Sequence, residues 1–357
     1  MTKALCLLFI FGAFFTQAQF EIDSFVQRDQ FDFDSKFPII RSDENPDAAE
    51  RINIVLHHRM LEKVFRMDDD QRFEMVFPPE GEFQGASEFE YYINANNERF
   101  FSISITCSYT GAYSEYHTSY FNFDAKTGQP ILLSDMFGES ARYDLSEWVN
   151  ASIYEEISDF MSNIDLDDPD GFGQEQYDLY DECSGWYEEV SMLSDEYYFM
   201  TDSTITFVKG RCSNHMMAAL DDLWEFYEEY SLLELQSKMS DDGIALMFGE
   251  KLNFSSTNIP EGKILEGTIG GKYPITMIIS NYYGDNFHGV YWYNKVKKPI
   301  KIEGKVNEFA FLELEESVND KVTGHMKLQV MSGGMLEGDW TNSNNSKKLE
   351  MKLTIGN

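Results

Sequence analysis

The chain has 357 residues, with 28 basic and 62 acidic side chains and a formal net charge of −34. Nucleic acids are bound through a basic surface that neutralises phosphates, so this balance excludes a nucleic-acid-binding protein. Residues 19–250 carry 50 acidic and 14 basic side chains, whereas residues 251–357 carry 12 acidic residues and 13 lysines. This asymmetry predicts a domain boundary near residues 240–252.

Residues 1–18 have the layout of a secretory signal peptide. One positive charge at Lys3 precedes an apolar run from Ala4 to Phe15, and small and polar residues follow up to Ala18. The run is too short for a membrane anchor, and no later stretch reaches the roughly 20 apolar residues that span a bilayer. We therefore expect cleavage after Ala18 and a mature protein that is periplasmic or secreted.

Residues 19–243 have the pattern of an α+β domain, in which helices cover an antiparallel sheet. Asn45 and Pro46 are typical of a helix start, and apolar residues at helical spacing follow as far as Phe65. Period-two alternation then predicts strands, and two further helical patterns follow. The predicted strands are residues 89–95, 101–109, 116–124, 197–200 and 204–208, and the later helices are residues 144–162 and 221–239.

Residues 244–357 contain short strand-like runs separated by glycine-containing turns, with no convincing helix. Several runs share the form apolar-x-Gly-x, as in LEGTI, FHGVY and LEGDW, where glycine relieves crowding at a strand bend. About eight strands at this spacing predict a small all-β domain, either a meander barrel or a sandwich. The clearest runs are residues 275–280, 290–293, 300–306, 326–330 and 349–355.

Three cysteines remain after removal of the signal peptide. Cys107 lies on the apolar side of an alternating run, where a free thiol packs as a small hydrophobe. Cys183 and Cys212 lie in more polar segments, and an oxidising compartment favours a disulfide between them. We predict this pair.

Four motifs give the first domain a resemblance to a known family. They are FPII at 37–40 ahead of ERIN at 50–53, SISITCSYTGAYSEY at 102–116, YFNFDAKTGQPILLSDMF at 120–137 and YYFMTDSTITF at 197–207. In order and spacing they resemble, over about residues 20–237, bacterial extracytoplasmic domains of unknown function. Such domains form the sensing part of lysozyme-responsive anti-sigma factors (RsiV-like) and precede the catalytic domain of some peptidoglycan deacetylases (PdaC-like). The resemblance implies an α+β domain that binds lysozyme or lies near peptidoglycan, and it brings no catalytic residues.

The motif at 120–137 predicts a structural corner rather than a working site. Asp124 ends a strand, and Lys126-Thr127-Gly128 forms a turn. Gly128 is expected to take a positive φ that other residues resist. Ser134 or Asp135 can then cap the following turn.

The residues give little support for a metal, cofactor or catalytic centre. None of the six histidines forms an H-x-x-x-H or H-E-x-x-H pair, and neither a G-x-S-x-G elbow nor a glycine-rich phosphate loop occurs. One acidic run is a weak candidate for Ca²⁺, because it departs from the EF-hand pattern and a solvated loop is the favoured interpretation. The run consists of Asp165, Asp167, Asp168 and Asp170.

The sequence as a whole favours an exported, non-catalytic binding protein of the cell envelope. We expect no cofactor and no membrane span, and we expect the acidic domain to recognise a basic protein such as lysozyme, or a cell-wall glycan. Solubility or a salty medium explains the same charge without a partner. Two further hypotheses stay open: a glycan-acting hydrolase that uses carboxylates the sequence does not identify, and a carrier that holds a small molecule inside the β domain.

Overall fold

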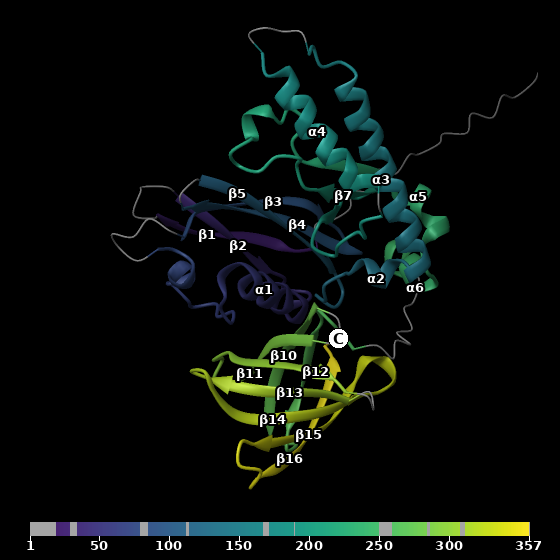
Figure 1. Cartoon of the computed structure of the whole chain (residues 1–357). Helices are drawn as coiled ribbons and strands as arrows, with labels where there is room; N and C mark the ends of the chain where they lie inside the picture. Colours follow the sequence, from purple (N-terminus) through teal and green to yellow (C-terminus); the bar gives the residue numbers. More distant parts are fainter. Residues whose placement is uncertain are drawn as a thin grey trace, which may run out of the picture.

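The structure is a computed structural model, and it describes residues 19–28, 34–78, 85–111, 114–166, 171–188, 190–249, 259–283, 286–307 and 311–356. An α+β domain lies above a closed β-barrel (Figure 1). The predicted fold class is therefore confirmed, and the β domain is a barrel rather than a sandwich. The predicted signal peptide lies outside the described residues.

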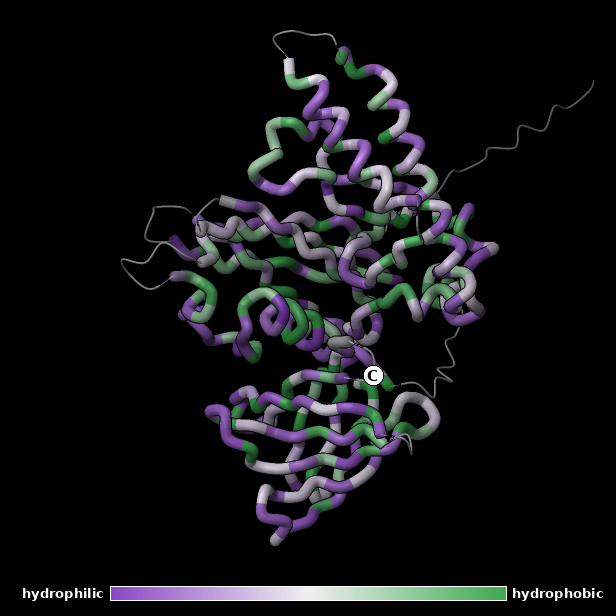
Figure 2. The backbone as a smooth tube through the Cα atoms, in the orientation of Figure 1, coloured by the Kyte–Doolittle hydropathy of each residue, from purple (hydrophilic) through white to green (hydrophobic). Residues whose placement is uncertain are grey.

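The first half of the α+β domain is a sheet packed on one long helix. A β1-β2 hairpin lies beside the antiparallel sheet β3-β4-β5, and hydrophobic stretches follow α1 and these strands (Figure 2). Because β4 alternates, its residues Phe101, Ile103 and Ile105 are fully buried in one cluster with Ile52 and Leu56 of α1. The elements are β1 (Glu21–Arg28), β2 (Asp34–Arg41), α1 (Pro46–Leu61), η1 (Arg72–Met75), β3 (Gly85–Asn96), β4 (Phe100–Thr110) and β5 (Ser114–Asp124).

The second half of the domain is a helical layer with a small sheet. Helices α3 and α4 pack on each other, and α3 contacts the edge strand of the antiparallel sheet β6-β7-β8. The elements are α2 (Leu133–Met136), α3 (Glu139–Met161), α4 (Gly173–Glu188), β6 (Tyr198–Met200), β7 (Thr204–Lys209), η2 (Ala218–Leu220), β8 (Phe226–Ser231), α5 (Leu232–Leu235), η3 (Gln236–Lys238) and α6 (Asp241–Phe248).

The predicted helix over residues 221–239 is wrong as far as Ser231, and only residues 232–238 are helical, as α5 and η3. Residues Phe226–Ser231 form β8, which pairs along its whole length with β7. Ser231 and Glu234 then form a capping box, which starts the four-residue helix α5. The apolar residues of this segment fit both the 3.6-residue period of a helix and the two-residue period of a strand. Only the pairing with β7 decides between the two structures.

Eight antiparallel strands close the barrel, because β9 pairs with both β10 and β16. Apolar side chains such as Met277, Leu314 and Leu353 fill its interior, so this is a packed core and does not favour a small-molecule carrier. The strands are β9 (Ile264–Ile269), β10 (Tyr273–Tyr283), β11 (Asn286–Tyr293), β12 (Ile300–Val306), β13 (Phe311–Val318), β14 (Lys321–Val330), β15 (Leu336–Asn342) and β16 (Lys348–Ile355), with η4 (Ser332–Gly334) before β15.

The expected domain limit between residues 243 and 244 falls inside α6. Leu246 and Met247 of this helix are buried in the core around α2 and α3. The N–H of Ser240, which caps α6, donates to the carbonyl of Met136 over 2.9 Å. Helix α6 therefore belongs to the first domain, which extends through residue 249.

The corner at residues 124–131 joins the two domains. The Gln129 side chain donates to the carbonyls of Ile264 and Gly356, both over 2.9 Å, and accepts from the N–H of Ile264 over 2.9 Å. One amide thus satisfies backbone groups at the ends of β9 and β16. The side chain is buried, so these hydrogen bonds are shielded from water.

Charged groups reinforce this junction. The guanidinium of Arg51 on α1 bonds Glu266 of β9 over 3.0 Å and the carbonyl of Thr127 over 2.9 Å. The ammonium of Lys263 pairs with Asp135 and also donates to a corner carbonyl. Both cations are buried, so losing either partner would leave a costly unpaired charge.

Gly128 has the positive φ that the sequence predicts, at +69°. A Cβ on this residue would lie 2.3 Å from the carbonyl oxygen of Ala48 in the first turn of α1. The turn also depends on Asp124, whose Oδ1 accepts from the N–H groups of Lys126 and Thr127, each over 2.8 Å. Only glycine fits between this turn and α1.

Replacing Gly128 with alanine tests this contact. We expect Gly128→Ala to lower the free energy of unfolding by about 2 kcal/mol or more, because the substitution adds backbone strain and a clash with helix backbone. Urea denaturation followed by circular dichroism measures the change. Gly138→Ala is the matched control, since a Cβ there meets nothing within 4 Å. Equal stability of the two variants would contradict the conclusion that only glycine fits at position 128.

Candidate functional site

Helices α3 and α4 form an arm that projects away from the barrel (Figure 1). In α3 the residues Leu145, Val149, Ile153 and Ile157 repeat every fourth position and are fully buried. In α4 the ring of Tyr180 packs against Phe160 of α3, with centroids 4.8 Å apart. We call α3 and α4 together the acidic arm, for the charges on their outer faces.

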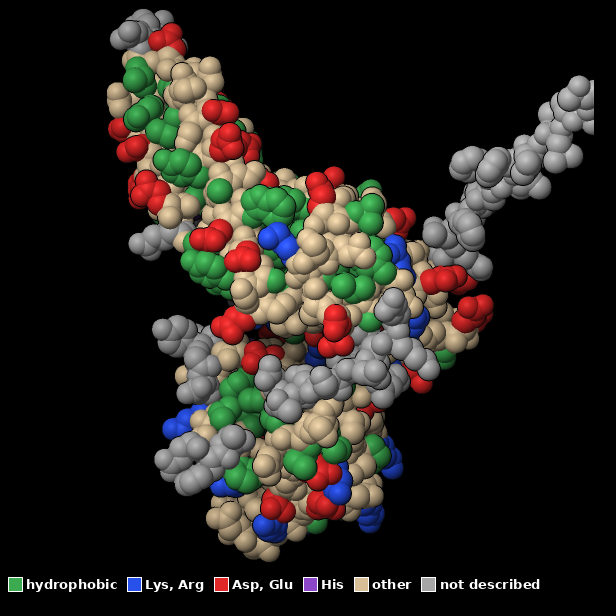
Figure 3. All heavy atoms as spheres, turned by 90° about the vertical axis from the view of Figure 1, so that its right-hand side faces the viewer, with side chains coloured by type: hydrophobic (Ala, Val, Ile, Leu, Met, Phe, Trp, Pro, Cys, Tyr) green, Lys and Arg blue, Asp and Glu red, His purple; other side chains and the backbone are tan. Residues whose placement is uncertain are grey.

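Negative charge is concentrated on the acidic arm. Its two helices carry eleven acidic residues and one basic residue, Arg142, and all eleven acidic residues are exposed. The wider region 139–234 contains 25 of the 50 acidic residues of residues 19–250, but only three of their 14 basic residues. Figure 3 shows acidic and apolar side chains along the arm, whereas acidic and basic side chains are mixed on the barrel. The acidic residues are Glu139, Asp144, Glu147, Glu155, Glu156, Asp159, Glu175, Asp178, Asp181, Glu182 and Glu188.

Large aromatic side chains are exposed among these acids. Tyr143, Trp148 and Tyr154 of α3 are 47%, 45% and 40% exposed, and Trp186 of α4 is 52% exposed. Aromatic rings supply apolar contact area and a face that attracts cations. The ammonium of Lys238 already lies 5.1 Å from the centre of the Trp148 ring. This combination of rings and carboxylates suits a cationic surface.

The side of the arm next to β8 concentrates the charge further. Trp148 stacks on Tyr230 of β8, with ring centroids 5.2 Å apart. Partial burial raises the pKa of Glu156, and the neighbouring carboxylate of Glu228 on β8 raises it further. Repulsion between these two carboxylates would be relieved by a cation bound between α3 and β8.

Cys183 and Cys212 form a disulfide in the structure, with Cα atoms 5.3 Å apart. This is the pair predicted from the sequence, and it ties α4 to the loop before η2. Cys107 is a free thiol and is only half-buried. Burial raises its pKa to about 11, so this thiol is not a reactive one.

The weak Ca²⁺ candidates are not brought together in the described part of the chain. Asp165 is exposed after α3, while Asp167, Asp168 and Asp170 lie outside the described residues. Among the described residues, no group of three or more His, Cys, Asp or Glu side chains is arranged to hold a metal ion. None of the described helices is long and apolar enough to cross a membrane.

A cleft of about 1190 Å³ lies between the α+β domain and the barrel. Figure 3 shows a hollow between the two domains, with acidic side chains at its edge. Burial raises the pKa of Asp195, with a further rise from the charge of Asp135. Burial also raises the pKa of Glu261, and the charge of Asp195 adds to it. Carboxylates whose pKa values are raised by burial and by a neighbouring charge are typical of functional sites.

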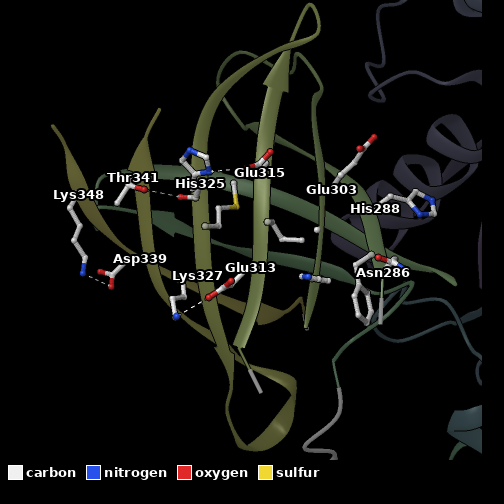
Figure 4. A pocket seen from close by; sticks show the side chains of 15 residues that line it. Asn286, His288, Glu303, Glu313, Glu315, His325, Lys327, Asp339, Thr341 and Lys348 are labelled. Atoms are coloured by element: carbon white, nitrogen blue, oxygen red, sulfur yellow. Dashed lines mark hydrogen bonds and ion pairs between the residues drawn. The ribbon is translucent and has the colours of Figure 1, made fainter. Parts of the chain in front are cut away.

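A second depression, of about 1200 Å³, lies on the outer face of the barrel (Figure 4). Its charges pair across neighbouring strands. Lys327 lies 2.8 Å from Glu313, and Lys348 lies 2.8 Å from Asp339. Because these charges largely neutralise one another, this face has less attraction for a charged partner than the acidic arm.

The sequence predicted the acidic domain, but it did not predict which residues form the acidic arm and the cleft. Trp148 and Trp186 stand out only when helix faces are assigned, and α4 was not among the predicted helices. Leu179, Tyr180 and Cys183, the buried residues of α4, were the available signal for this helix. Asp195 and Glu261 are far apart in the sequence, so no motif could join them.

No protein-family model matches the chain, and no curated protein matches it. Among solved structures, the chain is similar to the crystal structure of a member of the DUF3298 family from Bacteroides fragilis. The two share 9% sequence identity with a TM-score of 0.42, over 66% of this chain and 99% of that chain. That family is one of unknown function, so the similarity brings no ligand or activity to this chain.

Removing the disulfide tests its contribution to the domain that carries the arm. We expect Cys183→Ser combined with Cys212→Ser to lower the free energy of unfolding by about 3–4 kcal/mol, because the open loop gains conformational freedom when unfolded. Denaturation of the oxidised protein and the double variant gives the difference. Cys107→Ser is the control for loss of a thiol, and a double variant as stable as this control would contradict the expectation.

Proposed function

We propose that the protein is an exported, non-catalytic binding protein whose acidic arm recognises a basic protein. The observation that carries the proposal is the concentration of exposed carboxylates and aromatic rings on α3 and α4, with one basic residue among them. A charge required only for solubility would be served equally well by an even distribution. The signal-peptide layout of residues 1–18 and the disulfide support export.

The arrangement suits electrostatic capture followed by aromatic contact. A field of one sign steers an oppositely charged protein toward the arm and raises the rate of association. Trp148, Tyr154 and Trp186 can then bury apolar area against the partner, as aromatic residues do at the centres of interfaces. Binding of this kind weakens as salt screens the exposed charges.

Lysozyme is the first partner to test. It is a basic protein, and the motifs of the first domain resemble those of RsiV-like domains that sense lysozyme. A peptidoglycan-related ligand is the second option that the resemblance offers, through the PdaC-like context. The charge of the arm favours the protein partner over an uncharged glycan.

Charge reversal on the arm tests the proposal. We expect Glu147→Lys combined with Glu155→Lys to weaken binding to lysozyme at low salt by roughly tenfold or more, because attraction near the contact is replaced by repulsion. Isothermal titration calorimetry at several salt concentrations measures the affinity. The wild-type affinity should fall steeply as salt increases, and the variant should respond less.

A matched control separates the local field from the net charge. Glu44→Lys combined with Glu90→Lys makes the same change in net charge at exposed sites outside the arm. We expect this control to change the affinity by less than about threefold. Equal weakening in both variants would show that total charge matters and the arm does not. Absence of lysozyme binding by the wild-type protein would exclude lysozyme as the partner.

The cleft between the domains supports a second candidate function, a glycan-acting hydrolase. The observation is the carboxylate pair Asp195 and Glu261, each with a raised pKa in a site large enough for a ligand. One protonated and one ionised carboxylate are the requirement for glycoside hydrolysis.

A peptidoglycan assay tests this second function. If the protein is a hydrolase, it releases soluble fragments from peptidoglycan. Glu261→Gln then abolishes the release, while Glu188→Gln does not. If the wild-type protein releases no soluble fragments, the hydrolase function is excluded.

A further inference from the structure

The free edge of β5 faces the cleft between the domains. Sheet β3-β4-β5 ends at this strand. Among the described residues, β5 pairs along its length with β4 and makes one isolated bridge, from Phe123 to Pro130, on its other side. Thr118, Ser119 and Tyr120 line the cleft, together with Val55 and Met60 of α1. An unprotected edge of this kind can pair with another extended chain.

The backbone contacts show which atoms of β5 point outward. The carbonyl of Asn122 accepts from the N–H of Ile131 over 2.7 Å, and the N–H of Asp124 donates to Gln129 over 2.9 Å. Both contacts lie on the side of β5 away from β4. The β4-β5 register has no bulge, so the backbone groups of every second residue before Asn122 point the same way. These residues are Tyr116, Thr118 and Tyr120.

The outward groups of Tyr116, Thr118 and Tyr120 have no hydrogen-bond partner in the described part of the chain. Three N–H donors and three carbonyl acceptors therefore face the cleft in a row at the spacing of a β-ladder. Proteins usually protect such an edge by covering it or by placing charges on it. Within the described ranges, no segment pairs with this part of the strand, which lies beside a cavity large enough for an extended chain.

The lining of the cleft indicates what would occupy it. Side chains at odd positions of β5 face α1, as the packing of Phe121 in the α1 cluster shows. Phe121, Val55, Met60 and Ile278 give the cleft an apolar stretch. Alternate side chains of an added strand would point into this stretch, because successive residues of a strand point to opposite sides.

Charge around the cleft selects a basic chain. Five carboxylates line it, against a single arginine, Arg59, which is paired with Glu196. His58 adds no positive charge near neutral pH, because burial and the charge of Arg59 lower its pKa to about 4. The carboxylates are Glu62, Glu115, Asp195, Glu196 and Glu261.

We propose that β5 binds an extended basic polypeptide segment by strand addition, with alternate apolar side chains in the cleft and lysine or arginine against its carboxylates. Backbone hydrogen bonds to Tyr116, Thr118 and Tyr120 supply affinity, and the cleft supplies selectivity. This surface is distinct from the acidic arm. The inference goes beyond the proposed function and does not need lysozyme to be the partner.

A short synthetic peptide tests the inference directly. The probe has two lysines at each end and alternating valine and threonine between them, and it is added to the full-length protein. Residue-resolved hydrogen exchange by NMR is the measurement. In the free protein the amides of Tyr116, Thr118 and Tyr120 should exchange rapidly, and the peptide should slow their exchange by about tenfold or more. The same peptide with glutamate in place of lysine should not bind.

Proline at the edge separates backbone pairing from side-chain contact. Thr118→Pro removes an outward N–H without breaking the β4 ladder, because the paired groups belong to the neighbouring residues. Thr118→Val keeps that N–H and loses only the 3.0 Å contact between the hydroxyls of Thr118 and Thr106. We expect Thr118→Pro to weaken peptide binding by roughly tenfold and Thr118→Val to change it by less than about threefold.

Three outcomes would overturn the inference. The first is that the lysine peptide does not bind, and the second is that it binds without slowing exchange of the three amides. The third is that these amides are already protected in the free protein and become exposed on dilution, which would show a second copy of the chain on β5. Circular dichroism confirms that each variant is folded. If Thr118→Pro is unfolded, the exchange data on the wild-type protein decide alone.

Discussion

The tight turn at residues 124–131 is the constraint on which the rest of the structure depends. Three parts of the chain meet there: the end of β5, the first turn of α1 and the closing strands of the barrel. Gly128 permits the approach to α1, and the buried amide of Gln129 completes the backbone hydrogen bonding at the ends of β9 and β16. The same turn sets the separation of the two domains, and with it the width of the cleft beside β5.

Electrostatics divides the molecule into surfaces of different character. The barrel is nearly neutral, and its exposed charges pair across neighbouring strands. The acidic arm carries exposed carboxylates and exposed aromatic rings, while the cleft adds Asp195 and Glu261, whose burial opposes ionisation. Strong negative potential with apolar contact area on one face is a better basis for recognition than charge alone. Both proposals about partners rest on this division, one on the arm and one on the cleft.

Local patterns in the sequence were enough for much of the fold. Strict alternation from Phe101 to Tyr109 and the helical spacing after Pro46 report which face is buried, so β4 and α1 were predictable. Regular strand spacing after residue 260 indicated a small β domain. The β1-β2 hairpin and β8 were not predictable in this way, because non-local pairing decides the structure of these short mixed segments. The cleft was also out of reach, since Asp195, Glu261 and the edge of β5 become neighbours only when the domains dock.

Closure of the barrel by its first and last strands has a consequence for how the chain folds during synthesis. β9 needs β16 as a neighbour, and Gln129 needs the carbonyl of Gly356, which follows β16. The barrel can therefore neither close nor seal against the α+β domain until residues as far as Gly356 have been made. Until then, the growing β-sheet has two open edges, a state in which chains associate with one another. Contacts between residues so distant in sequence also form slowly, so completion of the barrel is the natural late step of folding.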